Sequence, residues 1–164
     1  METYKKKTTY DKILEIVAIA ALLGSFCPLL FYNTIATDAV FPIHYNFANE
    51  VDGWGGRSNL WGIPSIALLL YIGFSIVQRY PKIYNYPCLV TEQNRDYLYR
   101  MGVQLMRHIK VCVIIIFAYA SNDMYIGAIN KSSKPMPIVY AIVMAGMFVP
   151  VIIYVIKMIR DKPK

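Results

Sequence analysis

Residues 13–32 read ILEIVAIAALLGSFCPLLFY, a run of twenty residues in which Glu15 is the only charged side chain. A bilayer core about 30 Å thick is crossed by about 20 helical residues. The run is longer than the apolar part of a typical signal peptide, and no small-x-small cleavage site ends it. Cys27 follows Phe26, a bulky residue where a lipoprotein signal needs a small one. We therefore expect a membrane helix that is retained.

The whole chain has the composition of a small membrane protein. It has 164 residues, of which 57% are hydrophobic and 16% charged, and its mean hydropathy is +0.40. A soluble domain is about 45–50% apolar and about 25% charged, and a fold of this length cannot bury the excess. Disordered and nucleic-acid-binding tails are excluded for the same reason. Residues 60–77 and 138–156 carry no charge and predict two further spans.

A fourth span is expected at 107–125, although its strictly apolar part covers only residues 111–120. It reaches full length if Arg107 and Lys110 snorkel at one membrane boundary, extending their charged ends into water. Three spans and a buried half-helix are the alternative. The best prediction for residues 1–164 is a single domain, an all-α integral membrane protein with a four-transmembrane-helix bundle and a structured external loop at 33–59.

Lys and Arg in the flanking segments predict the orientation, because cytoplasmic segments are enriched in them. With both termini in the cytoplasm, 14 of the 17 basic residues lie inside and 3 outside. We expect the plasma (inner) membrane of a bacterium, multipass, and a net charge of +7 that meets anionic lipid headgroups rather than nucleic acid. Segment 79–106 then forms a cytoplasmic loop and an extension of the third helix, with Thr91 as its N-cap.

The loop at 33–59 carries the functional signal. Its central part, FPIHYNFANEVDGWGGR at 41–57, holds three glycines within four residues and a high density of polar groups for a connection between membrane helices. The candidate site residues are Pro42, His44, Asn46, Asp52, Gly53, Trp54, Gly55 and Arg57.

This stretch resembles the SdpI-like membrane protein family, which carries domain of unknown function 1648. The family's loop reads approximately Pro-x-His-aromatic-Asn-x-x-Gly-x-x-Asp-Gly-x-Gly and a basic residue. The matching residues are Pro42, His44, Tyr45, Asn46, Asp52, Gly53, Gly55 and Arg57. Asn49 stands where the family usually has glycine, and asparagine tolerates a left-handed backbone. A second similar stretch falls at 84–94, so the resemblance covers about residues 42–108.

The resemblance implies a non-enzymatic protein that acts in immunity to a secreted toxic peptide, or in signalling by holding a repressor at the membrane. Its implied partners are an extracellular toxin peptide and a cytoplasmic regulator, with no cofactor. The residues themselves leave an alternative, a membrane-embedded metal-dependent enzyme. In that case His44, Glu50 and Asp52 would hold a divalent ion, completed by Asp123. However, the chain has no H-E-x-x-H motif.

Two other interpretations of the loop are compatible with each other. His44, Asp52 and Arg57 satisfy one another and fix the loop over the bundle, because charged groups in a partly dry place are usually paired. The loop is also a candidate lid that binds a peptide or other ligand through aromatic side chains, namely Trp54, Tyr45 and Phe47.

Asp123 is expected near the outer membrane boundary, where ionisable residues tend to be partnered and functional. By charge and by side, Arg57 is its expected partner. The alternative is that Ser121, Asn122 and Asp123 end the third helix in water. Because the chain has no G-x-x-x-G pair, the sequence does not predict its oligomeric state.

Overall fold

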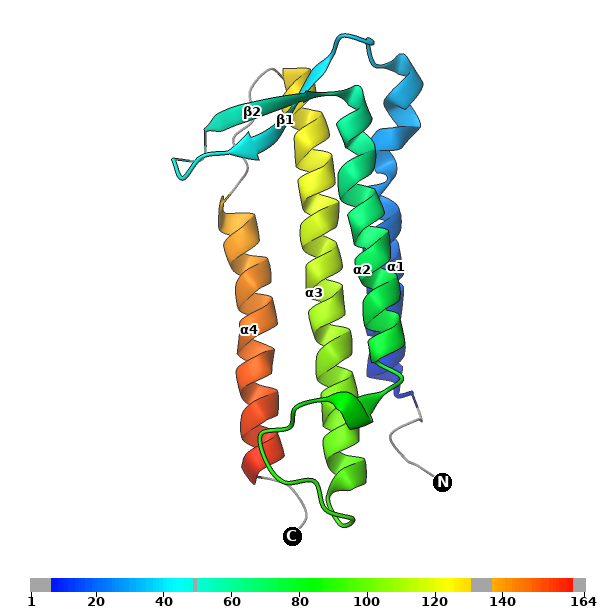
Figure 1. Ribbon diagram of the computed structural model, residues 1–164, viewed down its shortest axis with the longest axis vertical. Helices are drawn as coiled ribbons and strands as arrows, with labels where there is room; N and C mark the ends of the chain where they lie inside the picture. Colours follow the sequence, from blue (N-terminus) through cyan, green and yellow to red (C-terminus); the bar gives the residue numbers. More distant parts are fainter. Residues whose placement is uncertain (1–6, 49, 131–136, 161–164) are drawn as a thin grey trace.

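The computed structural model describes residues 7–48, 50–130 and 137–160. The elements in these ranges are α1 (Thr9–Ser25), η2 (Cys27–Thr34), β1 (Val40–Tyr45), β2 (Val51–Gly56), η3 (Arg57–Trp61), α2 (Gly62–Val77), η4 (Pro81–Ile83), α3 (Arg95–Asn130) and α4 (Pro137–Arg160). Four helical segments of the described chain are long and apolar enough to cross a membrane. These are α1 with η2, η3 with α2, α3, and α4 (Figure 1). The predicted multipass membrane architecture is confirmed.

Helix α3 is the central element of the bundle. It packs against α1, α2 and α4, whereas α4 makes its substantial helix contacts with α3 (Figure 1). Three small apolar clusters lie along α3, one above another. They consist of Leu14, Ala18 and Val111; of Leu22, Ala67 and Ile114; and of Phe41, Leu60 and Met124. The last cluster joins β1 to the end of α3.

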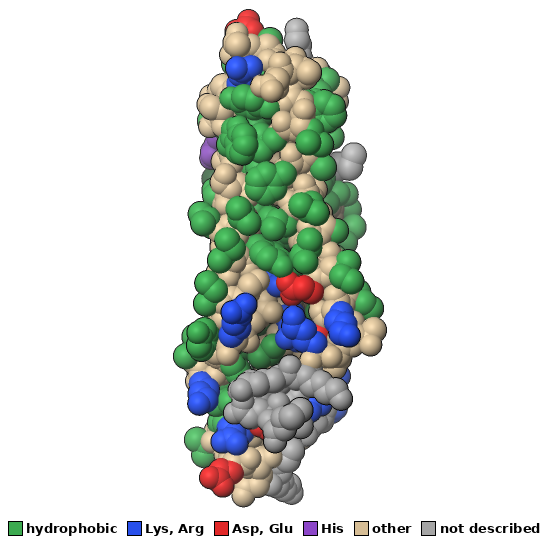
Figure 2. All heavy atoms as spheres, turned by 90° about the vertical axis from the view of Figure 1, so that its right-hand side faces the viewer, with side chains coloured by type: hydrophobic (Ala, Val, Ile, Leu, Met, Phe, Trp, Pro, Cys, Tyr) green, Lys and Arg blue, Asp and Glu red, His purple; other side chains and the backbone are tan. Residues whose placement is uncertain are grey.

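The outer surface of the bundle is apolar. Ile16, Leu23 and Leu69 are exposed, and most of α4 is exposed as well. Figure 2 shows hydrophobic side chains covering most of one face, with basic residues gathered toward the end that holds both termini. A helix that is apolar on its outward face suits hydrocarbon rather than water. The arrangement is therefore that of a bundle surrounded by lipid.

The span predicted at 13–32 is not one α-helix. Thr8 caps α1: its side chain accepts from the Asp11 backbone, while the Asp11 carboxylate accepts from the Thr8 backbone, so the helix begins at Thr9. Pro28, which has no backbone N–H to donate, stands in the first turn of η2, where the chain tightens into a 3-10 helix that ends at Thr34.

The third span is complete. Helix α3 has 36 residues, a length of about 54 Å, so it is longer than a bilayer core is thick. The half-helix alternative does not hold, because an 18-residue window of α3 is apolar enough to span. α3 begins at Arg95, four residues after the expected cap. Thr91 still orders the turn before it, since its hydroxyl accepts from the Asn94 backbone at 3.3 Å.

The expectation of an all-α protein is wrong in the segment between α1 and α2. This segment is a two-stranded antiparallel sheet between two 3-10 helices rather than a loop (Figure 1). β1 pairs with β2 from Val40 with Gly56 to Tyr45 with Val51, with irregular register around His44. Pro42 fits in β1 because both strands of a two-stranded sheet are edge strands. This hairpin packs on α3 at the end of the bundle away from both termini.

Candidate functional site

The two charged residues of the sequence motif meet across the hairpin. His44 Nδ1 on β1 lies 2.5 Å from Asp52 Oδ1 on β2. The His44 side chain is 71% exposed and the Asp52 side chain 44%. The predicted contact between these two residues is confirmed, but it is a contact at the surface. Exposed pairs of this kind contribute little to stability. Because both side chains are exposed, the pair is also accessible to a partner.

Asn46 closes the turn of the hairpin. Its backbone N–H donates to the Glu50 carbonyl at 2.9 Å, and its side-chain oxygen accepts from the Glu50 backbone at 2.9 Å. Its amide also donates to Glu50 Oε2 at 3.3 Å. The motif asparagine therefore has a clear structural role. Asn49, the departure from the family pattern, lies outside the described residues.

The structure does not assemble the metal site of the enzyme alternative. Glu50 is bonded to Asn46, whereas His44 and Asp52 bond to each other. Across the described ranges, no group of three His, Cys, Asp or Glu side chains could hold a metal ion.

At two motif glycines, Gly53 and Gly55, other atoms lie so close to the backbone that a Cβ would collide with them. A Cβ on Gly53 would lie 2.8 Å from the Cβ of His44, the residue paired with it in the sheet. At Gly55 a Cβ would collide with the side-chain amide of Asn59, which donates to the Gly56 carbonyl at 2.9 Å. A side chain at Gly53 would push the strands apart, whereas at Gly55 it would displace the Asn59 amide from its bond to Gly56.

Arg57 does not join His44 and Asp52, contrary to expectation. Its guanidinium donates to the Ile35 carbonyl at 3.1 Å and lies 4.8 Å from the centre of the Tyr32 ring. Arg57 thus ties the start of η3 to the end of η2, the two segments that flank the hairpin. A carbonyl freed at the end of a helix is a suitable acceptor for it.

Asp123 is not paired with Arg57 either. Its carboxylate accepts from the Tyr45 hydroxyl at 3.4 Å. Nor does the helix end there in water. Ser121 is buried and donates to the Ser25 carbonyl at 2.7 Å, and Asn122 donates to the Gly24 carbonyl at 2.9 Å. Asp123 is therefore a half-buried carboxylate on a candidate spanning helix, covered by the hairpin.

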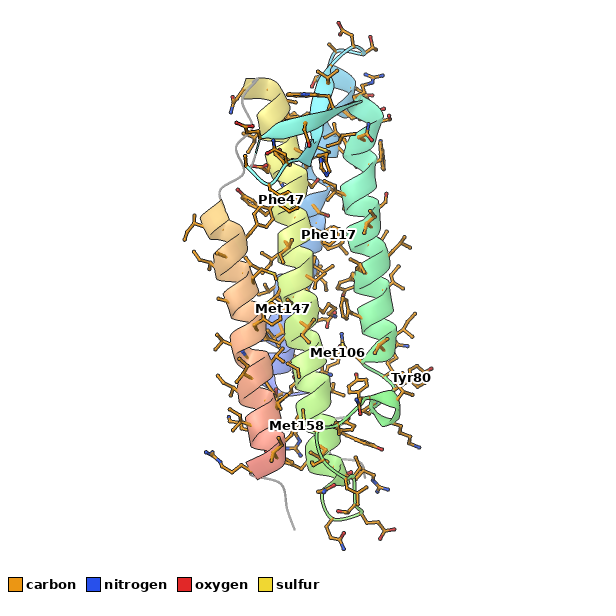
Figure 3. All side chains as sticks on the ribbon, turned by 60° about the vertical axis from the view of Figure 1, so that its left-hand side comes forward. Phe47, Tyr80, Met106, Phe117, Met147 and Met158 are labelled. Atoms are coloured by element: carbon orange, nitrogen blue, oxygen red, sulfur yellow. The ribbon has the colours of Figure 1, made fainter. Side chains whose placement is uncertain are left out.

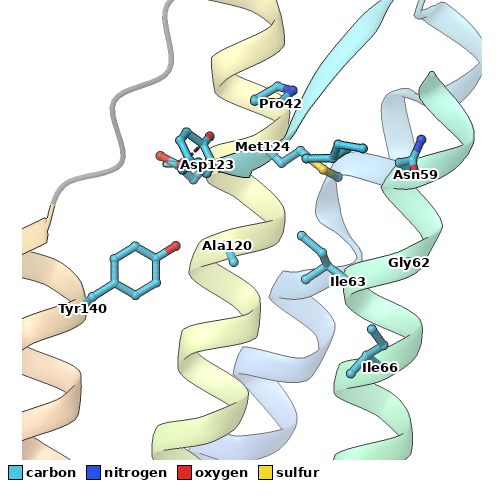
Figure 4. A pocket seen from close by; sticks show the side chains of 11 residues that line it. Pro42, Asn59, Gly62, Ile63, Ile66, Ala120, Asp123, Met124 and Tyr140 are labelled. Atoms are coloured by element: carbon cyan, nitrogen blue, oxygen red, sulfur yellow. Dashed lines mark hydrogen bonds between the residues drawn. The ribbon is translucent and has the colours of Figure 1, made fainter. Parts of the chain in front are cut away.

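A hollow of about 500 Å³ lies beneath the hairpin. Its wall comes from β1, η3, α2, α3 and α4, with Asp123 at the side of α3 and Tyr140 directed toward it from α4 (Figure 4). This volume falls in the range of sites for small ligands. The hairpin also exposes two large aromatic side chains: Phe47 in its turn, which is fully exposed (Figure 3), and Trp54 on β2, which is 51% exposed.

A second polar cluster was not foreseen from the sequence. It lies at the end of the bundle that holds the termini, between α1, α2 and α3. Lys110 is fully buried, and its ammonium donates to both oxygens of Glu15 at 2.9 Å and to the Ser75 hydroxyl at 3.3 Å. Tyr71 donates to the same Glu15 carboxylate at 2.5 Å.

Next to it, Arg107 lies 2.6 Å from the Asp11 carboxylate, and both side chains are buried. Arg107 and Lys110 thus do not snorkel into water, because two acidic residues of α1 meet them. A signal for this existed in the sequence. Asp11 and Glu15 are four residues apart and Arg107 and Lys110 three apart, so each pair occupies one helix face.

Comparison with protein-family models, curated proteins and solved structures finds no match to this chain. The family resemblance therefore remains a prediction from the motif residues.

Proposed function

We propose that this chain is a non-enzymatic multipass membrane protein of the SdpI-like type, which acts in toxin-peptide immunity or signalling through its hairpin. The proposal places it in the bacterial plasma membrane, with both termini in the cytoplasm and the hairpin outside. Its partners are then an extracellular toxin peptide or a cytoplasmic regulator.

One observation carries this proposal: the hairpin is a fixed platform that presents exposed groups. The Asn46–Glu50 contacts close its turn, and Arg57 joins the helices on either side of it. Phe47 and Trp54 remain exposed on the platform. Rigid aromatic side chains supply much of the binding energy at protein interfaces, and preorganisation lowers the entropy cost of binding. These features favour recognition over catalysis.

The proposal is tested by protection of a sensitive host. Cells would express the wild-type chain, Phe47→Ala, Trp54→Ala or His44→Ala at matched membrane levels, and would be challenged with secreted peptide toxins of related strains. We expect protection by the wild type and loss of protection in the aromatic variants. Asp38→Ala is the matched control, because Asp38 is exposed in the same segment before the hairpin begins.

Two results would contradict the proposal. The first is a lack of protection by a stably inserted wild-type chain against every toxin tried. The second is equal protection by the wild type and all hairpin variants, which would move the site away from the hairpin. Zinc that co-purifies with the wild type and is lost in His44→Ala would instead favour the metal-dependent enzyme.

A further inference from the structure

The hollow beneath the hairpin has a polar end and an apolar end. Tyr45 of β1, Asp123 and Asn59 contribute polar groups at the hairpin end, whereas Tyr140 lies lower, about level with Ala120 (Figure 4). Farther from the hairpin, the wall is made by apolar side chains of α2 and α3, namely Ile63, Ile66 and Ala120. Ile66 is 48% exposed on the outer surface of α2. The hollow therefore continues into a surface that faces lipid in the proposed membrane arrangement.

The carboxylate in this hollow is incompletely satisfied. In the part of the chain that the structure describes, Asp123 accepts one hydrogen bond, from Tyr45, at the long distance of 3.4 Å. An ionised carboxylate has about four acceptor positions. A carboxylate that is half-buried on a spanning helix is costly unless a positive charge or several donors meet it.

Arg57, which the sequence predicted as the partner of Asp123, binds other groups. Arg57 is bound to the Ile35 carbonyl and the Tyr32 ring. Lys110, on the same helix as Asp123, is bound to Glu15 about 20 Å away along the helix axis. Within residues 7–48, 50–130 and 137–160, neither of them neutralises Asp123, and a ligand could supply that positive charge.

Two tyrosine side chains contribute to the wall of the hollow near Asp123. Tyr45 and Tyr140 both line the hollow, and Tyr140 is held by an edge-to-face contact with Tyr119, with ring centres 5.0 Å apart. Tyrosine faces attract ammonium groups, most strongly where water is excluded. A carboxylate that shares a hollow with two tyrosines is thus suited to a cation, and the apolar wall below is suited to a hydrocarbon chain.

We propose that this hollow binds a cationic amphiphile, a single hydrocarbon chain with an ammonium head, which enters from the bilayer. The ammonium group donates to Asp123 and lies against Tyr45 and Tyr140. The chain runs along Ile63 and Ile66 of α2. This binding site goes beyond the proposed immunity function and does not depend on it.

The experiment uses dodecylammonium as the probe, added to the full-length protein in nanodiscs of neutral phosphatidylcholine. The unfolding temperature of the protein is followed as the probe is titrated. We expect a saturable rise for the wild type, because a ligand that binds the folded state stabilises it. In Asp123→Asn the half-saturating concentration should rise at least tenfold. Dodecanol and dodecyl sulfate, which lack the ammonium group, should produce no saturable rise.

Asp38→Asn is the matched control, because it removes the same charge from an exposed position outside the hollow. It should respond like the wild type. This control separates binding in the hollow from an effect of the protein's charge on how much probe enters the nanodisc. If Asp123→Asn does not insert, Ala120→Trp serves instead, since its side chain would fill the hollow, and the saturable rise should disappear. A wild type without a saturable rise, or an unchanged response in Asp123→Asn or Ala120→Trp, would overturn the proposal.

Discussion

The ammonium of Lys110 on α3 lies 2.9 Å from both carboxylate oxygens of Glu15 on α1. With the Tyr71 and Ser75 hydroxyls around them, these two groups form a hydrogen-bonded ionic cluster between three helices. Arg107 and Asp11 add a second ion pair nearby, one helical turn away along each helix. Such pairs stabilise a bundle mainly because separating the partners would leave one buried charge uncompensated.

Replacing Lys110 with methionine should therefore destabilise the protein strongly. The change leaves the Glu15 carboxylate without its cation, at a cost of about 3–5 kcal/mol in the free energy of unfolding. Thermal or denaturant unfolding of the purified protein in detergent, followed by circular dichroism, measures this. Lys12→Met is the control, because Lys12 is exposed on α1 and should change stability little.

The double change Glu15→Gln with Lys110→Met should recover much of that loss, since no unpaired charge then remains. A double variant as unstable as Lys110→Met would show that packing of the long lysine side chain, not charge pairing, holds α1 on α3.

A methyl group on Gly53 should disrupt the hairpin. The new Cβ would lie 2.8 Å from the His44 Cβ, and neither atom is at the end of a flexible side chain, so the strands must separate. Amide hydrogen exchange of Asn46 and Glu50 in the Gly53→Ala variant should be faster than in the wild type.

Gly56→Ala is the matched control, because a Cβ there meets nothing within 4 Å. Its exchange should match that of the wild type. Equal acceleration in both variants would point to glycine's backbone freedom rather than to the close approach at His44.

The His44–Asp52 contact should contribute less than about 1 kcal/mol to stability, because both side chains are substantially exposed. A double-mutant cycle with His44→Ala and Asp52→Ala, measured by unfolding, gives the coupling energy. The stability of the single His44→Ala variant, measured in the same cycle, shows whether any loss of protection reflects recognition or unfolding. A coupling of several kcal/mol would instead show that the pair stabilises the fold.

The proposed orientation is testable by labelling single cysteines on intact cells. Cys27, Cys88 and Cys112 would first be replaced by serine or alanine. A membrane-impermeant maleimide should then label Phe47→Cys in the exposed hairpin, but not Leu89→Cys. Leu89 is exposed in the connection between α2 and α3, and this connection lies at the end that holds both termini (Figure 1). The opposite pattern would invert the orientation and place the hairpin in the cytoplasm.

The spans could be predicted from the sequence because a helix that crosses a bilayer needs about 20 mostly apolar residues in a row. Residues 60–77 and 138–156 each lie within one observed candidate span. The long helix through 111–120 was also foreseen, because no proline interrupts it from Arg95 onward. The hairpin was missed because its signal is weak. Pro42 in β1 and three glycines in β2 break the alternation of apolar and polar residues that marks a strand.

The sequence by itself determined that this is a membrane bundle and which segment carries the polar motif. Both follow from local composition, because a segment surrounded by lipid must be apolar whereas a segment in water can carry polar residues. Only the tertiary structure decided the partners of the charged residues. Lys110 pairs with Glu15, Arg57 binds a carbonyl, and Asp123 faces a hollow under Tyr45. Charge signs permit many pairings, and the rotation and depth of each helix select among them.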